Sequence, residues 1–561
     1  MIVYREARRL INPARELARL RDLAAESMAA ESMNVEIARE LLIEFGRIES
    51  GVADALCPDF DEMEPLAGWR KVSVAIGRNF YRARRGLPIL DMREAIEALL
   101  EAAWPAEIGV STPEGYAYYS LFPESYVDTA DKFYREDPRA QIFVVGIRSI
   151  GASLSAAVAG TILELGGCVK TLTLRPRGHP SHREVRISES IRSEWHANRE
   201  AVYLLIDEGP GLSGTSLTSV AEVLSDAGID DSRIIFFPSW SPDSATLSSE
   251  RARARWVRHR KCPSEFDPDM FRGWRDLSAG KWRELFFAGA DFPAVHPAHE
   301  RRKFLRGHTL AKFVGFGERG RACFDRAKML HEAGFTSRPV EVTGGFLISD
   351  FAEGKPVAEI SSEFIRGMAG YLAFLRREAP SRQSVDWEEL FHMICINVEE
   401  ASGRDWSARL LAMRAAIEDQ PACELDGRMF RHEWIETPSG FFKSDALDHH
   451  DDHFFPGPLD IAWDVAAAMA EFGLNRGFFI ERYACDSGDR EIARRVPFYR
   501  IAYAAHRLAY SRLAATNLTG EEQARFRREV ARYSAELKSA LVAVTGSLGP
   551  EVDSSSLVGR I

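Results

Sequence analysis

Short, mainly apolar runs recur at intervals in the middle of the chain. They are QIFVVGI at 141–147, VKTLTL at 169–174, VYLLI at 202–206 and RIIFF at 233–237. Such runs are typical of strands that are buried on both faces of a parallel sheet. The sequence predicts helices between them, at 151–165 and 218–227. Strands that alternate with helices indicate βαβ units, so we expect a parallel α/β domain over residues 111–262.

The sequence on either side of this domain is more helical. Residues 1–110 have apolar positions at helical spacing and predict a helical N-terminal region with a packing or partner-binding role. Residues 263–299 predict a linker. Residues 300–510 open with short strands and continue as mostly helical sequence, which predicts an α+β domain. Residues 511–561 predict a C-terminal helix, with a frayed end at 549–561.

The overall composition limits the number of domains and the class of protein. The chain has 561 residues, of which 45% are hydrophobic and 28% charged, so we expect about three or four globular domains. The net charge of −11 argues against nonspecific binding of nucleic acid by the whole chain. Seven scattered cysteines without CxxC spacing fit a reducing compartment. Without a signal peptide or a membrane-length apolar run, a cytoplasmic protein is expected.

The strand at 202–206 leads into a polar loop. The string VYLLI-DEGPGLSGTS places two carboxylates at the strand end, followed by glycines and hydroxyl side chains, and then a helix. Glycines let backbone N–H groups approach an anion, hydroxyl groups add donors, and a helix N-terminus is electropositive. This composition predicts a phosphate site formed by Gly211, Ser213, Gly214, Thr215 and Ser216.

The same string resembles the phosphoribosyl-pyrophosphate motif of the type I phosphoribosyltransferases. That family has four apolar residues, two acidic residues and a loop ending in Thr-Gly-Gly-Thr. Here Leu212 and Ser213 depart from the pattern. The resemblance implies that Asp207 and Glu208 are catalytic residues that hold the ribose hydroxyls. It also implies that the loop holds the 5-phosphate of phosphoribosyl pyrophosphate, and that Mg²⁺ assists.

Two further segments agree with this resemblance. In the family, the turn after the first strand cradles the pyrophosphate, and basic residues after the next strand neutralise it as it leaves. By resemblance, these roles fall to Arg148, Ser149, Ile150, Gly151, Arg175 and Arg177. The alternative is a flavodoxin-like or other α/β domain with an incidental glycine-rich loop, and regulators that only bind a ligand also use this fold.

A second cluster of polar residues follows a predicted hairpin in the last third of the chain. HEWIET, a PSG turn and GFFKSDA form the hairpin, and acidic residues cluster after it. Phosphoryl transfer needs such groups, because one carboxylate acts as the base for the acceptor and another holds Mg²⁺. The sequence therefore predicts a second candidate site here.

This stretch resembles the C-lobe of the aminoglycoside-phosphotransferase and protein-kinase-like fold. That family has a catalytic-loop Asp followed by an Asn, a hairpin, a magnesium-binding Asp, and a helix that opens near Asp-x-x-Asp-Leu-Ala. Here Asp445 matches the metal ligand, and Asp460-Ile-Ala-Trp-Asp464 matches the helix motif. Asp426 is the best candidate for the catalytic base, and His432 stands where Asn is expected.

The sequence before this stretch contains candidates for the lysine that binds the ATP phosphates. By the same resemblance Lys312, in LAKFVGFG, is the first candidate and Lys303 the competitor. The helix predicted at 322–333 would be the regulatory helix of this lobe. The run DHHDDH at 448–453 also offers metal ligands, but adjacent side chains point in different directions, so only one or two could join Asp445 at Mg²⁺.

Together these patterns predict two small-molecule sites on one chain. A phosphoribosyltransferase-like enzyme, which uses or binds phosphoribosyl pyrophosphate with Mg²⁺, would be fused to a kinase-like phosphotransferase or ATP-binding domain that acts on a small metabolite. Two alternatives stay open. A non-catalytic regulator would bind a nucleotide or phosphoribosyl pyrophosphate without turnover. An RNA-binding scaffold would use the basic stretch Arg251–Lys261, although a solvated helix face is the preferred interpretation of that stretch.

Overall fold

The computed structural model describes residues 1–3, 8–28, 34–138, 141–289, 292–415, 417–474 and 476–546, which fall into two compact units. Among these residues, unit 1 contains 1–3, 273–314 and 320–546, and unit 2 contains 8–272 and 315–319. The predicted frayed end at 549–561 lies outside the described residues.

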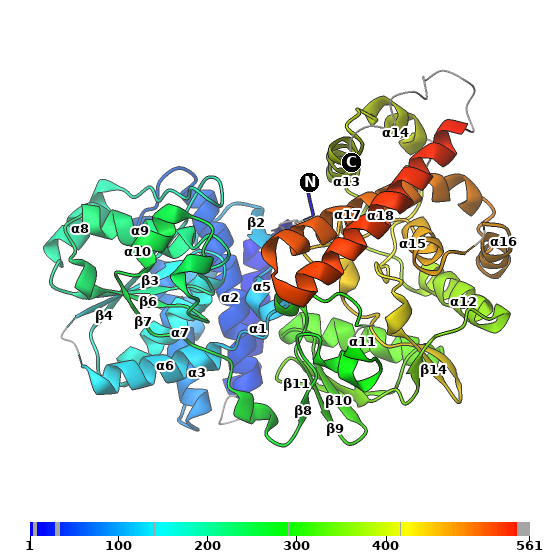
Figure 1. Ribbon diagram of the computed structural model, residues 1–561. Coiled ribbons are helices and arrows are strands. Elements are labelled where there is room, and N and C mark those ends of the chain that lie inside the picture. Colours follow the sequence, from blue (N-terminus) through cyan, green and yellow to red (C-terminus); the bar gives the residue numbers. More distant parts are fainter. Residues whose placement is uncertain are drawn as a thin grey trace. The chain divides into compact units, whose positions relative to one another are not determined.

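Unit 2 is built on a five-stranded sheet in which every pairing is parallel (Figure 1). The strand order is β4-β3-β5-β6-β7. The strands are β3 (Ile142–Ile147), β4 (Val169–Leu174), β5 (Val202–Ile206), β6 (Ile234–Phe237) and β7 (Arg260–Lys261). The four predicted strands are therefore confirmed. By position along the chain the order is 2-1-3-4-5, which places ligands at the carboxyl ends of the strands in doubly wound folds.

Helices cover both faces of this sheet, as Figure 1 shows. On one side lie α6 (Pro123–Glu136) and α7 (Ile150–Glu164), and on the other lie α8 (Glu189–Ala197), α9 (Thr215–Asp226) and α10 (Glu250–Trp256). The side chains of β3 and β5 are buried throughout because both faces are covered. This burial explains why their sequences are continuously apolar.

The N-terminal helices belong to the same unit as the parallel sheet. They are α1 (Pro13–Met28), α2 (Val35–Leu56), α3 (Ala67–Arg84) and α4 (Arg93–Leu100), followed by the short α5 (Glu114–Ala117). A two-stranded antiparallel pair, β1 (Arg8–Ile11) with β2 (Ile108–Ser111), joins them. A Cβ on Gly77 of α3 would lie 2.0 Å from the carbonyl oxygen of Ala156 in α7, so α3 and α7 are in backbone contact. The region 1–110, predicted as a helical N-terminal region, shares a core with α7.

Unit 1 opens with a five-stranded antiparallel sheet of order β11-β12-β10-β9-β8. Its strands are β8 (Arg275–Asp276), β9 (Lys303–Arg306), β10 (Thr309–Phe313), β11 (Pro339–Thr343) and β12 (Phe346–Asp350), with helix α11 (Gly317–Glu332) between β10 and β11. The segment 263–299, predicted as a linker, thus contributes β8 to this sheet. A smaller sheet follows, made of β13 (Lys355–Pro356), β14 (Trp434–Thr437) and β15 (Gly440–Lys443), and it contains the predicted hairpin.

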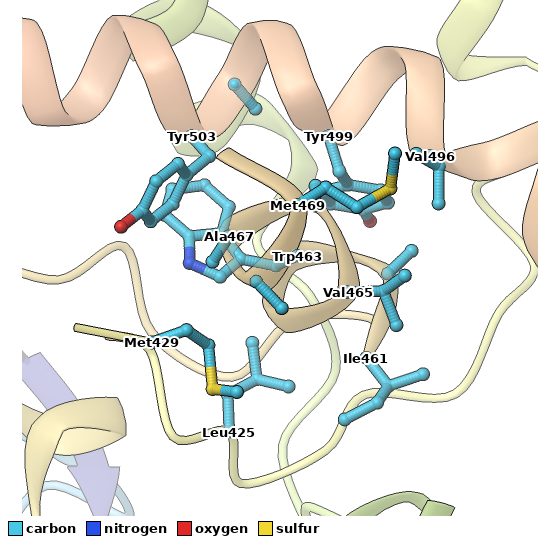
Figure 2. Packing of buried hydrophobic residues seen from close by; sticks show 14 of the residues in the cluster. Leu425, Met429, Ile461, Trp463, Val465, Ala467, Met469, Val496, Tyr499 and Tyr503 are labelled. Carbon is cyan, nitrogen blue, oxygen red and sulfur yellow. The ribbon is translucent and has the colours of Figure 1, made fainter. Parts of the chain in front are cut away.

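The rest of unit 1 is helical. Its helices are α12 (Ser362–Glu378), α13 (Trp387–Ser402), α14 (Ser407–Arg414), α15 (Ala462–Phe472), α16 (Arg476–Ser487), α17 (Ile492–Asn517) and α18 (Gly520–Gly546). Figure 2 shows Trp463 of α15 packed beside Tyr499 and Tyr503 of α17, with Leu425 and Met429 nearby. These contacts anchor the loop that carries the candidate residue Asp426. No helix in the described parts of the chain is both long and apolar enough to cross a membrane.

Candidate functional site

A lysine and two carboxylates meet at a cavity of about 180 Å³ in unit 1. Lys312 projects from β10, while Asp445 and Asp448 follow β15. The Lys312 Nζ lies 2.5 Å from Asp445 Oδ1 and 3.0 Å from Asp448 Oδ1. The structure therefore brings together the predicted phosphate-binding lysine and the predicted metal ligand. Lys303, the competing lysine, pairs with Glu300 at 3.1 Å and lies 3.8 Å from Asp445.

Opposite charges keep these carboxyl groups ionised. Burial opposes ionisation of Asp445, but the Lys312 ammonium holds the pKa of this carboxyl well below its usual range. The pKa of Asp448 is likewise held well below its usual range, because Lys312 and Arg301 outweigh the effect of burial. Two acidic oxygens beside a buried ammonium are thus preorganised for a cation and for phosphate oxygens.

His449 adds a possible ligand between two acidic groups. Asp445, Asp448 and His449 each offer a ligand atom, and these atoms lie within 4.8 Å of one another. A second set with the same spacing consists of Asp426, Glu433 and His449. Carboxylate oxygens are the donors that Mg²⁺ prefers, so the first set fits this ion. Of the predicted run 448–453, Asp448 and His449 are the residues that belong to these sets.

Asp426 is buried beneath this cluster. Its side chain has no exposed surface, accepts a hydrogen bond from the Tyr371 hydroxyl at 2.7 Å, and lies 3.1 Å from the Lys443 ammonium. Its backbone N–H, together with that of Gly427, donates to the Asp464 carboxylate at 2.8 and 2.9 Å. The predicted helix motif around Asp464 therefore holds the loop that carries Asp426. Burial is the largest influence on the pKa of Asp426 and raises it. The Lys443 ammonium acts in the opposite direction, and the net result is a lowered pKa.

Several charged residues of this site were not recognised in the sequence. Lys443 joins Asp426 to Glu433, whose carboxylate it contacts at 2.7 Å. Arg301 donates to Asp448 at 3.0 Å and to Asp452 at 3.1 Å. These side chains come from the hairpin and from the segment that precedes β9. The sequence could have indicated a role for Lys443, because this residue lies at the end of the predicted hairpin. It could not indicate a role for Arg301, because its partners lie far away along the chain.

The second candidate site lies at the carboxyl end of β5 in unit 2. Asp207 and Glu208 follow the last strand residue, and α9 begins at Thr215 after Gly214, whose φ of 72° is left-handed. The Ser213 and Thr215 hydroxyls are 2.9 Å apart, and the Thr215 hydroxyl donates to the Pro180 carbonyl at 2.5 Å. The strand, loop and helix are therefore arranged as the sequence predicts. Gly211 and Ser216 lie on the same loop and at the start of the same helix.

The two carboxyl groups at this strand end have raised pKa values. Burial raises the pKa of Asp207 to about 7, and burial together with the Glu114 carboxylate raises that of Glu208 to about 8. The Glu208 carboxylate accepts a hydrogen bond from the Gly115 N–H at 3.1 Å. A cation or a hydroxyl-rich ligand at this point would compensate the buried charge.

The turn after β3 is strained. Ser149 has a φ of 95°, which is unusual for a residue with a side chain, and its N–H donates to the Ser50 hydroxyl at 2.8 Å. Ile150 and Gly151 form the first turn of α7, and a Cβ on Gly151 would lie 2.7 Å from the Ile206 carbonyl oxygen. The turn therefore touches the end of β5, beside the acidic pair.

The three predicted arginines lie together around two carboxylates from the N-terminal region. Arg148 is buried between Asp54 and Asp61, at 3.2 and 2.9 Å. Arg175 donates to Asp54 at 3.0 Å, and Arg177 pairs with Asp61 at 3.0 Å. The sequence did not indicate these two acids, because they lie more than eighty residues before their partners. The proposed contacts of these arginines with pyrophosphate stay predictions.

A cavity of about 240 Å³ adjoins the strained turn. Its lining includes Arg47, Ser50, Asp54, Ser149 and Arg175. The residues of the predicted phosphate loop, 213–216, are not among its lining residues. In the basic stretch, Arg251 and Arg255 pair with Glu222 and Asp231 at 2.6 and 2.7 Å.

No protein-family model matches the chain, and no curated protein matches it. Among solved structures, the chain is similar to a choline/ethanolamine kinase family protein from Mesorhizobium loti, with 18% identity, 44% of this chain and 89% of that chain covered, and a TM-score of 0.30. For an ethanolamine kinase from Plasmodium vivax these values are 12%, 55%, 92% and 0.32. For a GDP complex of wild-type aminoglycoside 2'-phosphotransferase-IIIa they are 10%, 45%, 92% and 0.30. TM-scores of this size do not establish a shared fold, so the site geometry has to carry the functional argument.

Proposed function

We propose that unit 1 is a kinase-like domain that binds a nucleotide with Mg²⁺ and transfers phosphate to a small molecule. The observation that carries this proposal is the placement of Lys312 between Asp445 and Asp448 in the lining of one cavity. Phosphoryl transfer depends on such a set, because a lysine orients the nucleotide phosphates and a carboxylate-bound metal neutralises their charge.

The arrangement suggests how a nucleotide would enter. Its phosphate oxygens would bind the Lys312 ammonium. Mg²⁺ would bind the Asp445 and Asp448 oxygens that now contact that ammonium. Each buried charge would exchange one partner for another, so none would be left without compensation. Asp426 stays the candidate base. Because it is buried against Lys443 and Tyr371, it would need access to the acceptor hydroxyl through a local rearrangement.

Calorimetric titration of the full chain with Mg–ATP tests the proposal. We expect binding in the wild type, and a loss of at least about tenfold in affinity for Asp445→Asn, which keeps the shape and removes the charge. Asp405→Asn, at an exposed position on the same unit, is the control and should bind as the wild type does. If the wild type does not bind Mg–ATP, or if Asp445→Asn binds equally well, the proposal is wrong.

Turnover separates an enzyme from a regulator. Release of phosphate from Mg–ATP is measured with the wild type and with Asp426→Asn. A base that acts in the reaction predicts loss of turnover, by roughly a hundredfold or more, with nucleotide affinity retained. Nucleotide binding without any turnover in the wild type would favour the regulator.

For unit 2 we propose phosphoribosyl pyrophosphate as the ligand class. The specific observation in favour is the placement of the Asp207–Glu208 pair beside the Gly214 loop and the start of α9, at the carboxyl end of a parallel strand. A thermal-shift measurement with this sugar phosphate and Mg²⁺ tests it. We expect stabilisation of the wild type and not of Asp207→Asn. Equal shifts in both proteins, or none in the wild type, would exclude the assignment.

A further inference from the structure

A buried arginine on one of the C-terminal helices lines the unit 1 cavity. Arg507 lies on α17, is 7% exposed and lines the cavity. Its guanidinium carbon lies 4.7 Å from the ring centre of Phe430, 5.0 Å from that of Tyr510 and 5.4 Å from that of Tyr533. The Arg507 Nε also donates to the Tyr533 hydroxyl at 3.3 Å. Three rings therefore hold a permanently charged group in one orientation.

Arg507 differs from the other cations of the cavity in lacking an acidic partner. The others each have a carboxylate within 4.0 Å: Arg301 with Asp448 and Asp452, Lys303 with Glu300, Lys312 with Asp445 and Asp448, and Arg428 with Asp452. Within the described residues, no carboxylate oxygen lies that close to the Arg507 guanidinium. Glu471, the acid behind Tyr533, already pairs with Arg532 at 3.0 Å.

The rings that contact the Arg507 guanidinium are aromatic side chains without charge. Tyr510, Phe526, His296 and His299 also line the cavity, and Tyr510 lies next to both His299 and Phe526. Burial lowers the pKa of His296 to about 4 and that of His299 to about 2, so both imidazoles are neutral at neutral pH. A buried cation without an acidic partner is costly, and an anionic ligand would compensate it. The rings favour a ligand whose anionic group adjoins a flat, apolar body.

We propose that the part of this cavity next to Arg507 binds a small molecule that carries an anionic group, such as a phosphate or carboxylate, next to a ring, and that it excludes cationic amines. Arg507 would pair with the anion, and Phe430 and Tyr510 would contact the ring. This inference rests on the proposed function of unit 1, because the same cavity contains Lys312 and Asp445.

Three probes with one ring and different charges test the inference. Phenyl phosphate, phenol and phenyltrimethylammonium are each titrated calorimetrically into the full chain without nucleotide. We expect phenyl phosphate to bind more tightly than phenol, and the cation to bind least. Arg507→Gln should weaken the binding of phenyl phosphate by about tenfold or more and leave that of phenol nearly unchanged. Arg500→Gln is the matched control, because Arg500 lies on the same helix and pairs with Glu536 outside the cavity.

Several results would overturn the inference. These are absence of phenyl phosphate binding to the wild type, equal affinity for the three probes, and unchanged binding by Arg507→Gln. The last would place the probe elsewhere on the chain, for example at the loop 213–216. If Arg507→Gln does not fold, as judged by its circular dichroism, Arg507→Lys decides. Lysine keeps the charge but not the planar fork, so weakened binding supports the inference and unchanged binding overturns it.

The outcome is separable from the proposed function, because the probes are titrated without nucleotide. If Mg–ATP does not bind but phenyl phosphate binds through Arg507, the nucleotide assignment fails and the anion site stands. If Mg–ATP binds and phenyl phosphate does not, the reverse holds.

Discussion

Lys312 stabilises unit 1 through two buried carboxyl groups. It has 7% of its side chain exposed and contacts both Asp445 and Asp448. The pKa of each acid is held well below its usual range, so their contribution to stability is present above the unfolded pKa of about 4 and is lost as the pH falls further. Removal of the lysine would leave negative charges without their main partner.

We predict that Lys312→Met lowers the free energy of unfolding by about 3 kcal/mol at pH 7, because it leaves buried charge uncompensated. Urea unfolding measures this change. Added Mg²⁺ should restore more stability to the variant than to the wild type, since the ion takes the place of the ammonium. Lys328→Met, at an exposed position on α11, is the control. A variant as stable as the wild type would show that the pair is not important for folding.

Asp207 should act on stability with the opposite pH dependence. Its pKa is about 7 in the fold, against a usual value near 4, so the folded state binds more protons than the unfolded state between these values. The contribution of Asp207 to the free energy of unfolding is therefore greatest below about pH 4 and is lost as the pH rises to about 7.

We predict that Asp207→Asn is more stable than the wild type at pH 8 by at least about 1 kcal/mol, since one pKa unit corresponds to about 1.4 kcal/mol. At pH 5 the difference should be smaller, because only about one of the roughly three pKa units that separate the folded and unfolded states has been passed. Thermal unfolding at the two pH values measures the difference. Asp226→Asn, at an exposed position on α9, should not change the dependence. The same fall in stability in Asp207→Asn and wild type would mean that Asp207 does not titrate in this range.

Individual residues could be assigned from the sequence only where a local motif carried them. Asp445 and Lys312 were found because each adjoins a predicted strand, and the structure brings the two together. Arg507 gave no signal, because α17 is buried on nearly all sides and shows no polar face that would mark one arginine. Asp54 and Asp61 were missed because their partners are set by the fold and not by neighbouring residues.

Among the elements, the contact between α3 and α7 depends on glycine. Gly77 of α3 faces the backbone of α7, and a Cβ there would lie 2.0 Å from the Ala156 oxygen. A methyl group could be accommodated only if one helix moved. Gly68, on the same helix, meets only the Leu99 side chain, at 3.5 Å.

We predict that Gly77→Ala destabilises unit 2 by about 2–3 kcal/mol, because overpacking forces a backbone shift. Gly68→Ala, the control, should be neutral or slightly stabilising, since alanine favours helix over glycine. Chemical denaturation monitored by circular dichroism measures both. Similar stabilities for the two variants would contradict the close packing of α3 on α7.

The type of an element could be predicted where burial imposed a pattern. Strands β3, β5 and β6 of the parallel sheet are buried on both faces, so they could be predicted from apolar runs. Strands β1 and β8 were not predicted. β1 is largely exposed, and β8 has only two residues, so neither carries an apolar pattern. Their pairing depends on distant segments, which local sequence cannot indicate.

For the whole molecule, separate cores predict separate responses to ligands. The core that includes Trp463 and Tyr503 belongs to unit 1, and the core that includes Phe143 and Trp195 belongs to unit 2. We predict that Mg–ATP slows hydrogen exchange around β10 and the loop 444–452 in unit 1 and leaves β5 and α9 unchanged. Mass spectrometry of peptides measures the exchange. Equal protection in both units would indicate that a nucleotide binds unit 2 as well.

The membership of the first residues in unit 1 has a consequence for biosynthesis. Ile2 is held by Asn397, whose side chain accepts from the Ile2 N–H at 2.6 Å and donates to its carbonyl at 2.8 Å. The ribosome makes one partner near the beginning and the other nearly four hundred residues later. At roughly 5–20 residues per second, this segment waits about 20 to 80 seconds for Asn397 to be made. Unit 2, which needs residues only up to 319, can complete itself first.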